Sequence, residues 1–274
     1  MNIIIYLIII LFVFYVLNTF HKIERFSNYE VFPTNEVLEP IPKVIISTYY
    51  DKNKIPQKVF KNIKKYAYDY QYIVFDDSQI ITFLKKYYPS NVLNTFHELD
   101  KGAHKADLFR YCYLYIYGGI YLDIKTELIE PIQKTFDKPY TNFYTVLSLH
   151  KPTIYQGIIA SAPKNPIFLQ LIDHIVNVKK PVKRYFEFTV DFYKKLRNYY
   201  NFYEFNNQFY LDENNSQNQY QSQNKKFNLY LFKEICSKKS EDCCDGLDKY
   251  KLCCYVYDEK KKVIKTRYAD YPWN

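Results

Sequence analysis

Two adjacent glycines, Gly118 and Gly119, impose the strongest constraint on how this chain folds. The chain holds only five glycines in 274 residues, so each is expected where the backbone needs a positive φ or a close approach. Residues 103–117 predict a helix that ends at Gly118 in an αL cap. Residues 120–125 alternate in the manner of a strand. The two faces of that strand would carry Ile120, Leu122 and Ile124 on one side and Tyr121, Asp123 and Lys125 on the other.

The flanking sequence repeats this alternation of strand and helix. Residues 44–46 and 72–75 are short apolar runs typical of buried strands, and a segment with helical spacing lies between them. A further helix is predicted over 80–88, with Asp77 or Ser78 as its cap. Downstream, 157–160, 254–257 and 263–264 are strand-like and 168–176 is helical. This order predicts an α/β fold with a mostly parallel central sheet flanked by helices.

The N-terminal segment predicts a transmembrane helix over residues 1–20. Residues 3–17 are all apolar or Tyr, and a helix of about 18–20 residues rises about 27–30 Å, enough to cross a bilayer. Neither a basic leader nor a small-residue cleavage site is present, which favours an uncleaved anchor. Residues 21–40 are interpreted as a stem, and 41–274 as the catalytic domain with a polar insertion at 201–226.

The side of the membrane on which the domain lies stays open from sequence. His21, Lys22 and Arg25 follow the predicted span, so the positive-inside rule favours the cytosol. The formal net charge of +9 suits a polyanionic partner, but the lysines are scattered and no zinc-finger or RNP pattern is present. We therefore expect nearly all of the lysines to lie on solvated faces, and no nucleic acid as a partner.

Three charged residues are the candidates for chemistry. Asp107 and Arg110 lie three apart on the predicted helix and share a face, and Asp123 lies toward the carboxyl end of the following strand. In open α/β sheets, ligands bind at that end. Arginine offers a rigid fork for phosphate or hydroxyl groups, and aspartate binds hydroxyls or a hydrated cation. An ordinary ion pair on the helix, worth only about 0.3–0.5 kcal/mol, explains Asp107 and Arg110 equally well on spacing alone.

The segments 106–111 and 114–123 resemble the DXD sugar-binding region of glycosyltransferase family 32. That family includes initiating α-mannosyltransferases and inositol-phosphoceramide mannosyltransferases. The resemblance extends to 41–45, to 55–59 and to 156–163. It implies a GT-A fold, a nucleotide-sugar donor and hexose transfer with retention to a glycan or glycolipid. GDP-mannose is the first expectation for the donor and a UDP-hexose the second. The alternatives are a sugar-nucleotide-binding pseudoenzyme and a basic, membrane-anchored binding protein.

The resemblance also assigns roles to site residues. Asp107 and Arg110 would hold the donor sugar, Asp123 would lie near the ribose and a Mn²⁺ or Mg²⁺ ion, and Tyr121 would contact the donor. Tyr49 would stack on the base, and Trp273 would reach the diphosphate. Lys125 stands where the family has its second carboxylate. Either a metal is retained through Asp123 and Asp270, or Lys125 itself neutralises the departing diphosphate.

The cysteines divide into one isolated residue and one cluster. Cys112 lies on the predicted apolar helix and is expected in the core. The other five are Cys236, Cys243, Cys244, Cys253 and Cys254. Their spacing fits disulfides in an oxidising compartment or a zinc cluster in a reducing one. Disulfides, together with a glycosylation sequon at 214–216, favour a lumenal domain, against the orientation that the flanking charges indicate.

Overall fold

A computed structural model describes residues 39–150, 152–200, 202–205, 208–211, 227–238 and 252–266. The contacts of the chain group Leu38–Asn274 into one compact unit. The predicted transmembrane segment 1–20 and nearly all of the stem lie outside the described residues. Within the described ranges, no helix is both long enough and apolar enough to cross a bilayer.

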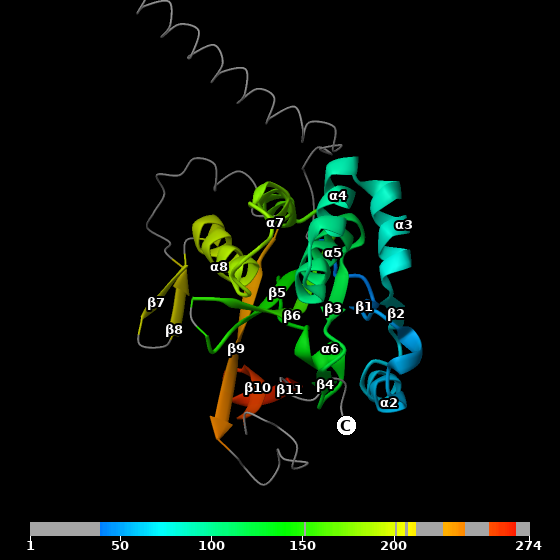
Figure 1. The fold of residues 1–274 in the computed structure, drawn as a ribbon. Coiled ribbons are helices and arrows are strands. Elements are labelled where there is room, and N and C mark those ends of the chain that lie inside the picture. The colour runs from blue at the N-terminus through cyan, green and yellow to red at the C-terminus, as the bar shows by residue number, and fades with distance from the viewer. Residues whose placement is uncertain are drawn as a thin grey trace, which may run out of the picture. The chain divides into compact units, whose positions relative to one another are not determined.

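A nine-stranded sheet forms the centre of the fold, in the order β2-β1-β3-β6-β5-β9-β10-β11-β4 (Figure 1). Its strands are β1 (Val44–Thr48), β2 (Gln71–Phe75), β3 (Gly119–Leu122), β4 (Thr126–Leu128), β5 (Phe143–Leu147), β6 (Ile154–Ser161), β9 (Leu229–Lys238), β10 (Leu252–Asp258) and β11 (Lys261–Thr266). A separate hairpin pairs β7 (Phe202–Phe205) with β8 (Gln208–Leu211).

The expectation of a mostly parallel sheet is wrong, because the sheet is mixed. Only β1–β2, β1–β3 and β5–β9 pair in parallel, and the other five pairings are antiparallel. The connections explain the difference. The segment that joins β5 to β6 is too short for the crossover that parallel neighbours need, and two residues, Glu259 and Lys260, join β10 to β11. The predicted alternation of strand and helix holds only for the N-terminal half.

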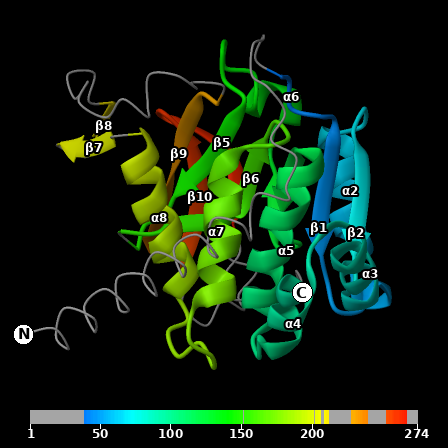
Figure 2. The ribbon, with the colours of Figure 1, turned by 90° about the horizontal axis from the view of Figure 1, so that it is seen from above.

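Helices cover this sheet and its β1–β2 edge. They are α2 (Gln57–Tyr66), α3 (Asp77–Tyr87), α4 (Ser90–Glu98), α5 (Gly102–Tyr117), α6 (Ile132–Thr135), α7 (Pro166–Asn177) and α8 (Glu187–Tyr200), with a short 3-10 turn η1 (Lys52–Lys54) after β1. Figure 2 shows α5, α7 and α8 side by side on one face of the sheet. The cap of α3 is Asp76, which forms a capping box with Gln79, and not Asp77 or Ser78 as the sequence suggested.

The helix–glycine–strand unit is present as α5, Gly118 and β3. Gly118 has φ 64 and ψ −160, so its φ is positive as expected, but its ψ lies outside the αL region. A Cβ at Gly118 would lie 2.7 Å from the backbone of Ser161 and Pro163, so only glycine fits this turn. The strand ends at Leu122, earlier than predicted, which leaves Asp123 and Lys125 in the turn that follows. That turn carries both side chains to the carboxyl end of β3.

Candidate functional site

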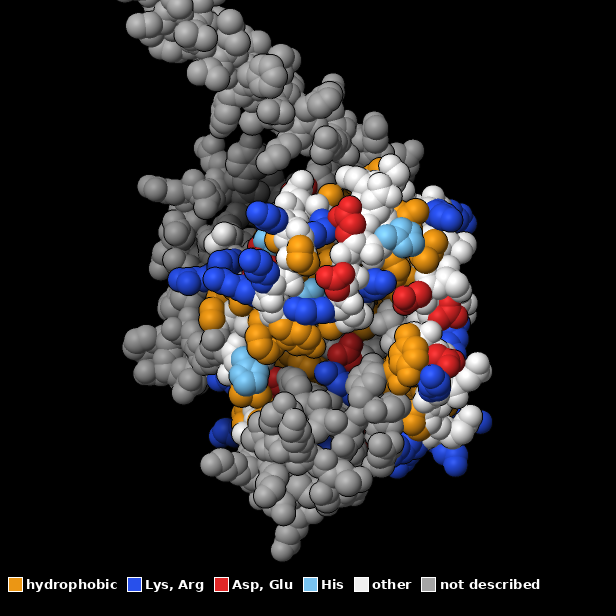
Figure 3. Space-filling view, viewed as in Figure 1, with side chains coloured by type: hydrophobic (Ala, Val, Ile, Leu, Met, Phe, Trp, Pro, Cys, Tyr) orange, Lys and Arg blue, Asp and Glu red, His pale blue; other side chains and the backbone are white. Residues whose placement is uncertain are grey.

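A cavity of about 550 Å³ opens at the carboxyl ends of β1 and β3. Its walls come from the loop after β1, the first turns of α5, the end of β3, the start of β6 and the segment that leads into α8. The sequence candidates Tyr49, Asp107, Arg110, Tyr121, Asp123 and Lys125 all line it. Figure 3 shows a hollow bordered by hydrophobic side chains with acidic and basic groups inside it. The structure therefore brings together in one cleft every predicted site residue that it describes.

Arg110 is the centre of the charged group. Its side chain is only 4% exposed, and Nη2 lies 3.3 Å from Asp107 Oδ1 and 3.6 Å from Asp123 Oδ1. Its Nε donates to the carbonyl of Ala106, and its Nη1 donates to the carbonyl of Gln156. The guanidinium thus bridges α5, β3 and β6 and fixes the two carboxylates relative to each other. The ion pair between Asp107 and Arg110 on the helix is present, but it is buried and it includes Asp123 as a third charge.

Tyr121 supports the same group from β3. The guanidinium carbon of Arg110 lies 4.2 Å from the centre of the Tyr121 ring, a cation–π contact. The Tyr121 hydroxyl donates to Asp123 Oδ1 at 3.0 Å and lies 3.2 Å from the hydroxyl of Thr48 on β1. The ring of Tyr121 therefore packs against the guanidinium of Arg110, and its hydroxyl holds the carboxylate of Asp123.

Asp123 lies where β3 leaves the sheet. Its N–H donates to the carbonyl of Gly157 at 2.8 Å, which ties the turn to β6. Lys125 Nζ lies 3.9 Å from Asp123 Oδ2. Both side chains keep about a fifth of their surface exposed, 20% for Asp123 and 19% for Lys125, so both face the cavity. A carboxylate and an ammonium are thus presented side by side to any ligand.

Burial dominates the electrostatics of the two helix residues. Burial raises the pKa of Asp107 to about 6, although the charge of Arg110 opposes the rise. Burial alone lowers the pKa of Arg110, but Tyr121, Asp107 and Asp123 together raise it above its ordinary value. Arg110 therefore stays charged, and Asp107 changes charge near pH 6. With its amide nitrogen facing Asp107, Gln156 donates to Asp107 Oδ1 at 3.2 Å and accepts from the N–H of Thr189 at 3.1 Å.

Tyr49 lies at the cavity wall but is not an open platform. Its side chain is 7% exposed and packs in a cluster with Ile55, Val59 and Ile124. The ring of Tyr50, which is 63% exposed, lies 4.7 Å away between ring centres. Sequence reasoning missed Tyr50, and only the turn geometry after β1 reveals that it borders the cavity. The predicted stacking role of Tyr49 stays a prediction.

The described residues do not fit a divalent metal in this cavity. One oxygen of Asp123 faces Arg110 and the other faces Lys125, so both sides of the carboxylate already have a cationic neighbour. Among the described residues, the one group of three metal-ligating side chains is Glu234, Cys236 and Cys254, and none of these lines the cavity. The other predicted metal ligand, Asp270, and the predicted diphosphate ligand, Trp273, lie outside the described residues.

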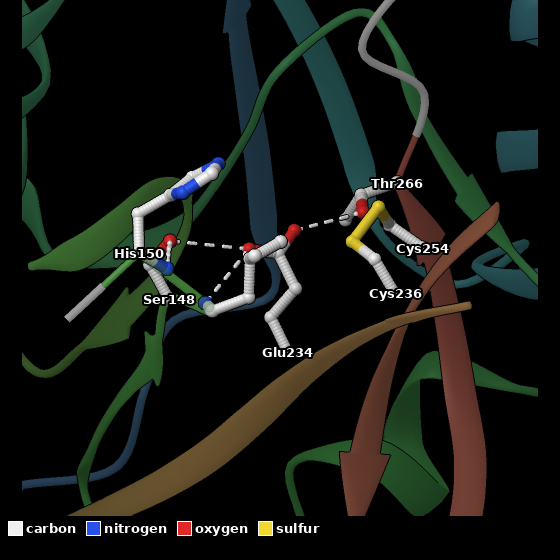
Figure 4. The surroundings of a disulfide bond; sticks show 7 residues. Ser148, His150, Glu234, Cys236, Cys254 and Thr266 are labelled. Atoms are coloured by element: carbon white, nitrogen blue, oxygen red, sulfur yellow. Dashed lines mark hydrogen bonds between the residues drawn. A yellow bond between two sulfur atoms is a disulfide. The ribbon is translucent and has the colours of Figure 1, made fainter. Parts of the chain in front are cut away.

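A buried carboxylate that sequence reasoning missed supports the cavity wall (Figure 4). Glu234 on β9 accepts hydrogen bonds from Ser148 Oγ at 3.3 Å, from the N–H of Leu149 at 3.4 Å and from Thr266 Oγ1 at 3.0 Å. It therefore joins β9 and β11 to the segment between β5 and β6, part of which lines the cavity. No sequence motif marks Glu234, because its partners are distant along the chain.

The structure also places three of the cysteines. Cys236 and Cys254 are directly paired across β9 and β10 and form a disulfide. Cys112 is a free, buried thiol on α5, as expected for a core residue, and burial raises its pKa. Cys243 and Cys244 lie outside the described residues, and the side chain of Cys253 is not described.

Comparison with known proteins finds relatives of the region that contributes part of the cavity wall. Residues 54–142 match the family described as "Glycosyltransferase sugar-binding region containing DXD motif". Mannosyl phosphorylinositol ceramide synthase CSH1 of Saccharomyces cerevisiae is 33% identical over 144 residues, which cover 51% of this chain and 36% of that protein. Initiation-specific alpha-1,6-mannosyltransferase of the same yeast is 32% identical over 128 residues, which cover 43% of this chain and 26% of that protein. These matches confirm the resemblance that the motifs indicated.

The matched region is a part of each protein. The chain spans less than half of the length of the curated relatives that it matches. One solved structure, "PaToxG Glycosyltransferase", is similar at a TM-score of 0.44 and 18% identity, over 58% of this chain and 69% of that one.

Proposed function

We propose that this chain, whose residues 54–142 match the family of glycosyltransferase sugar-binding regions, is a membrane-anchored retaining glycosyltransferase. It would transfer a hexose from a nucleotide sugar to a glycan or glycolipid. Mannose from GDP-mannose is favoured because relatives of this region are named for mannosyl transfer, and a UDP-hexose is second. The observation that carries the proposal is the buried Arg110, which holds Asp107 and Asp123 at the wall of one cavity.

The donor sugar would be bound by carboxylates that the arginine orients. Two nitrogens of Arg110 are occupied by backbone carbonyls, and the third faces Asp107 and Asp123. The guanidinium is therefore a fixed support, and the carboxylate oxygens are the groups left to accept hydrogen bonds from sugar or ribose hydroxyls. Such bonds to charged acceptors are worth about 1.5–3 kcal/mol each.

Lys125 would act on the leaving group. In transfer, the bond from the anomeric carbon to the diphosphate breaks, a bond to the acceptor oxygen forms, and the proton of the acceptor hydroxyl passes to the departing diphosphate or to water, so negative charge develops on the diphosphate as it leaves. An ammonium at the cavity wall would stabilise that charge, which is the electrostatic effect that a bound metal ion would also supply. Asp123 at 3.9 Å keeps the ammonium in place. We propose transfer that does not require a metal.

The disulfide favours a lumenal catalytic domain. Cys236 and Cys254 are oxidised across β9 and β10, and such bonds persist in the secretory pathway rather than in the cytosol. Together with the apolar segment 1–20, this supports a protein held by its N-terminus with residues 41–274 in the lumen. The acceptor would then be a glycan or glycolipid at the membrane.

Hydrolysis of a panel of nucleotide sugars by the purified chain tests the proposal. One donor, expected to be GDP-mannose, should be cleaved to free hexose and nucleoside diphosphate, and Asp123→Ala should abolish this turnover. Asp137→Ala, a change of an exposed aspartate outside the cavity, is the matched control and should leave turnover intact. Turnover that survives Asp123→Ala would contradict the proposed site.

One observation favours a second candidate, a sugar-nucleotide-binding pseudoenzyme. Lys125 replaces the second motif carboxylate, which would leave binding intact while removing the usual metal ligand. A pseudoenzyme would gain thermal stability on addition of a nucleotide sugar and would show no turnover. A basic membrane-anchored binding protein would show neither stabilisation by a nucleotide sugar nor turnover of it.

A further inference from the structure

The segment that joins α7 to α8, Val178–Phe186, concentrates positive charge. Four of its residues are Lys179, Lys180, Lys183 and Arg184, and none is acidic. The side chain of Lys180 is directed toward the end of α7, where its Nζ donates to the carbonyls of Val176 and Val178. The same Nζ lies 3.6 Å from Glu98 Oε2. The other three cations are exposed. Figure 3 shows such a group of Lys and Arg side chains next to hydrophobic ones, above the hollow.

Two exposed aromatic side chains end the same segment. Tyr185 is 56% exposed and Phe186 is 51% exposed, and their rings meet edge to face at 5.2 Å. Exposed hydrophobic side chains that lie next to each other and are bordered by polar residues mark sites of interaction with proteins or membranes. Aromatic rings with neighbouring cations are typical of surfaces that lie at the interface of an anionic bilayer.

The segment is attached to the helix that carries the site. On the first turn of α5, His104 Nε2 lies 3.0 Å from the carbonyl of Tyr185. Lys101, which precedes α5, donates to the carbonyl of Val182 at 3.4 Å and lies 5.7 Å from the Tyr185 ring. Tyr185 and Phe186 also line the cavity. Burial, with the charges of Asp107 and Asp123, raises the pKa of Tyr185, so its hydroxyl lies within electrostatic reach of the site.

We propose that Val178–Phe186 is a membrane-contact surface that faces the same leaflet as the catalytic domain, binds anionic headgroups of lipids in that leaflet through Lys179, Lys183 and Arg184, and places Tyr185 and Phe186 at the bilayer interface. The cavity mouth would then face the membrane, where a lipid-linked acceptor can enter it. The statement about the cavity mouth rests on the proposed function, and the statement about lipid binding does not. A bilayer is favoured over nucleic acid because the three exposed cations of this segment are followed directly by two exposed hydrophobic rings.

Hydrogen exchange on the full chain tests this contact locally. The chain is bound to vesicles of phosphatidylcholine alone or with phosphatidylserine, and exchange is followed in a peptide that spans 178–186. We expect slower exchange on the anionic vesicles only, and a return to the fast rate at high salt. Because the readout is local and needs no donor, it is independent of membrane insertion at the N-terminus and of any transferase activity.

A triple variant and a matched control make the test specific. Each cation near an anionic surface is worth about 1 kcal/mol, a factor of about five, so replacing Lys179, Lys183 and Arg184 by Gln should weaken the contact roughly 100-fold. The control replaces Lys61, Lys64 and Lys65 on α2 by Gln, which removes the same charge, and should keep the protection. Equal protection on neutral vesicles, protection by an oligonucleotide but not by vesicles, or protection in the 178–186 variant would each overturn the proposal.

Discussion

Asp107 sets the pH dependence of the site. Since burial raises its pKa to about 6, Asp107 is mostly ionised only above that pH. Only there can it accept hydrogen bonds from hydroxyls of the nucleotide sugar as a charged carboxylate. We expect kcat/KM for donor hydrolysis to fall as the pH drops through about 6. Asp107→Asn should remove this limb and lower kcat/KM above it about 100-fold. An acid limb that persists unchanged in the variant would show that another group titrates.

The same shift predicts how stability changes with pH. The pKa of Asp107 rises from 3.8 in the unfolded chain to about 6 in the folded one, so ionisation of this carboxyl costs folding free energy. As the pH rises from below 3.8 to above 6, the free energy of unfolding of the wild type should therefore fall by roughly 3 kcal/mol relative to that of Asp107→Asn. Urea unfolding of both proteins at the two ends of this range measures the difference. A constant difference would contradict the buried, ionising carboxyl.

Lys125 predicts the response to metals. If its ammonium stabilises the leaving diphosphate, a chelator should leave donor turnover unchanged, and Lys125→Met should lower kcat about 100- to 1,000-fold. Lys125→Asp rebuilds the two-carboxylate motif and should make turnover depend on added Mn²⁺. A strict metal requirement in the wild type would rule out the role proposed for the lysine.

At the scale of elements, the start of β6 controls where Asp123 lies. A Cβ at Gly157 would lie 2.8 Å from Asp123 Oδ2 and 2.5 Å from the Tyr155 hydroxyl, so one side chain must move. We expect Gly157→Ala to displace Asp123 and to lower kcat/KM about 100-fold. Gly102→Ala is the control, since a Cβ there meets nothing within 4 Å. Equal effects of the two changes would mean that Gly157 has no special relation to Asp123.

Local patterns predicted the elements near the site well. The helix before the glycine pair, the strand after it, the strand at 157–160 and the helix at 168–176 are confirmed as α5, β3, β6 and α7. Strand direction was not predictable in the same way, because β11 pairs antiparallel with β4 from far along the chain. Nor could local sequence reveal Glu234 or Gln156, whose importance comes from partners that only the folded sheet brings near.

At the scale of the whole molecule, Glu234 links the C-terminal strands to the cavity. It holds Ser148 and Leu149 beside β9 while Thr266 on β11 donates to its other oxygen. Glu234→Gln retains the shape but loses charged acceptors, so we expect a lower melting temperature and a higher KM for donor, with kcat changed less. Thr266→Val, which removes the bond on the far side, should lower the melting temperature and leave KM near the wild-type value.

The central claim is that Asp107 and Asp123 act on one donor through a shared arginine. The most direct measurement is kcat/KM for donor hydrolysis in Asp107→Asn, Asp123→Asn and the double variant. Residues that act as a unit are not additive, so the double variant should be about as slow as the slower single variant. If the fold-reduction of kcat/KM in the double variant equals the product of the two single reductions, the two carboxylates act independently. That result would contradict the account of a single arginine-centred site.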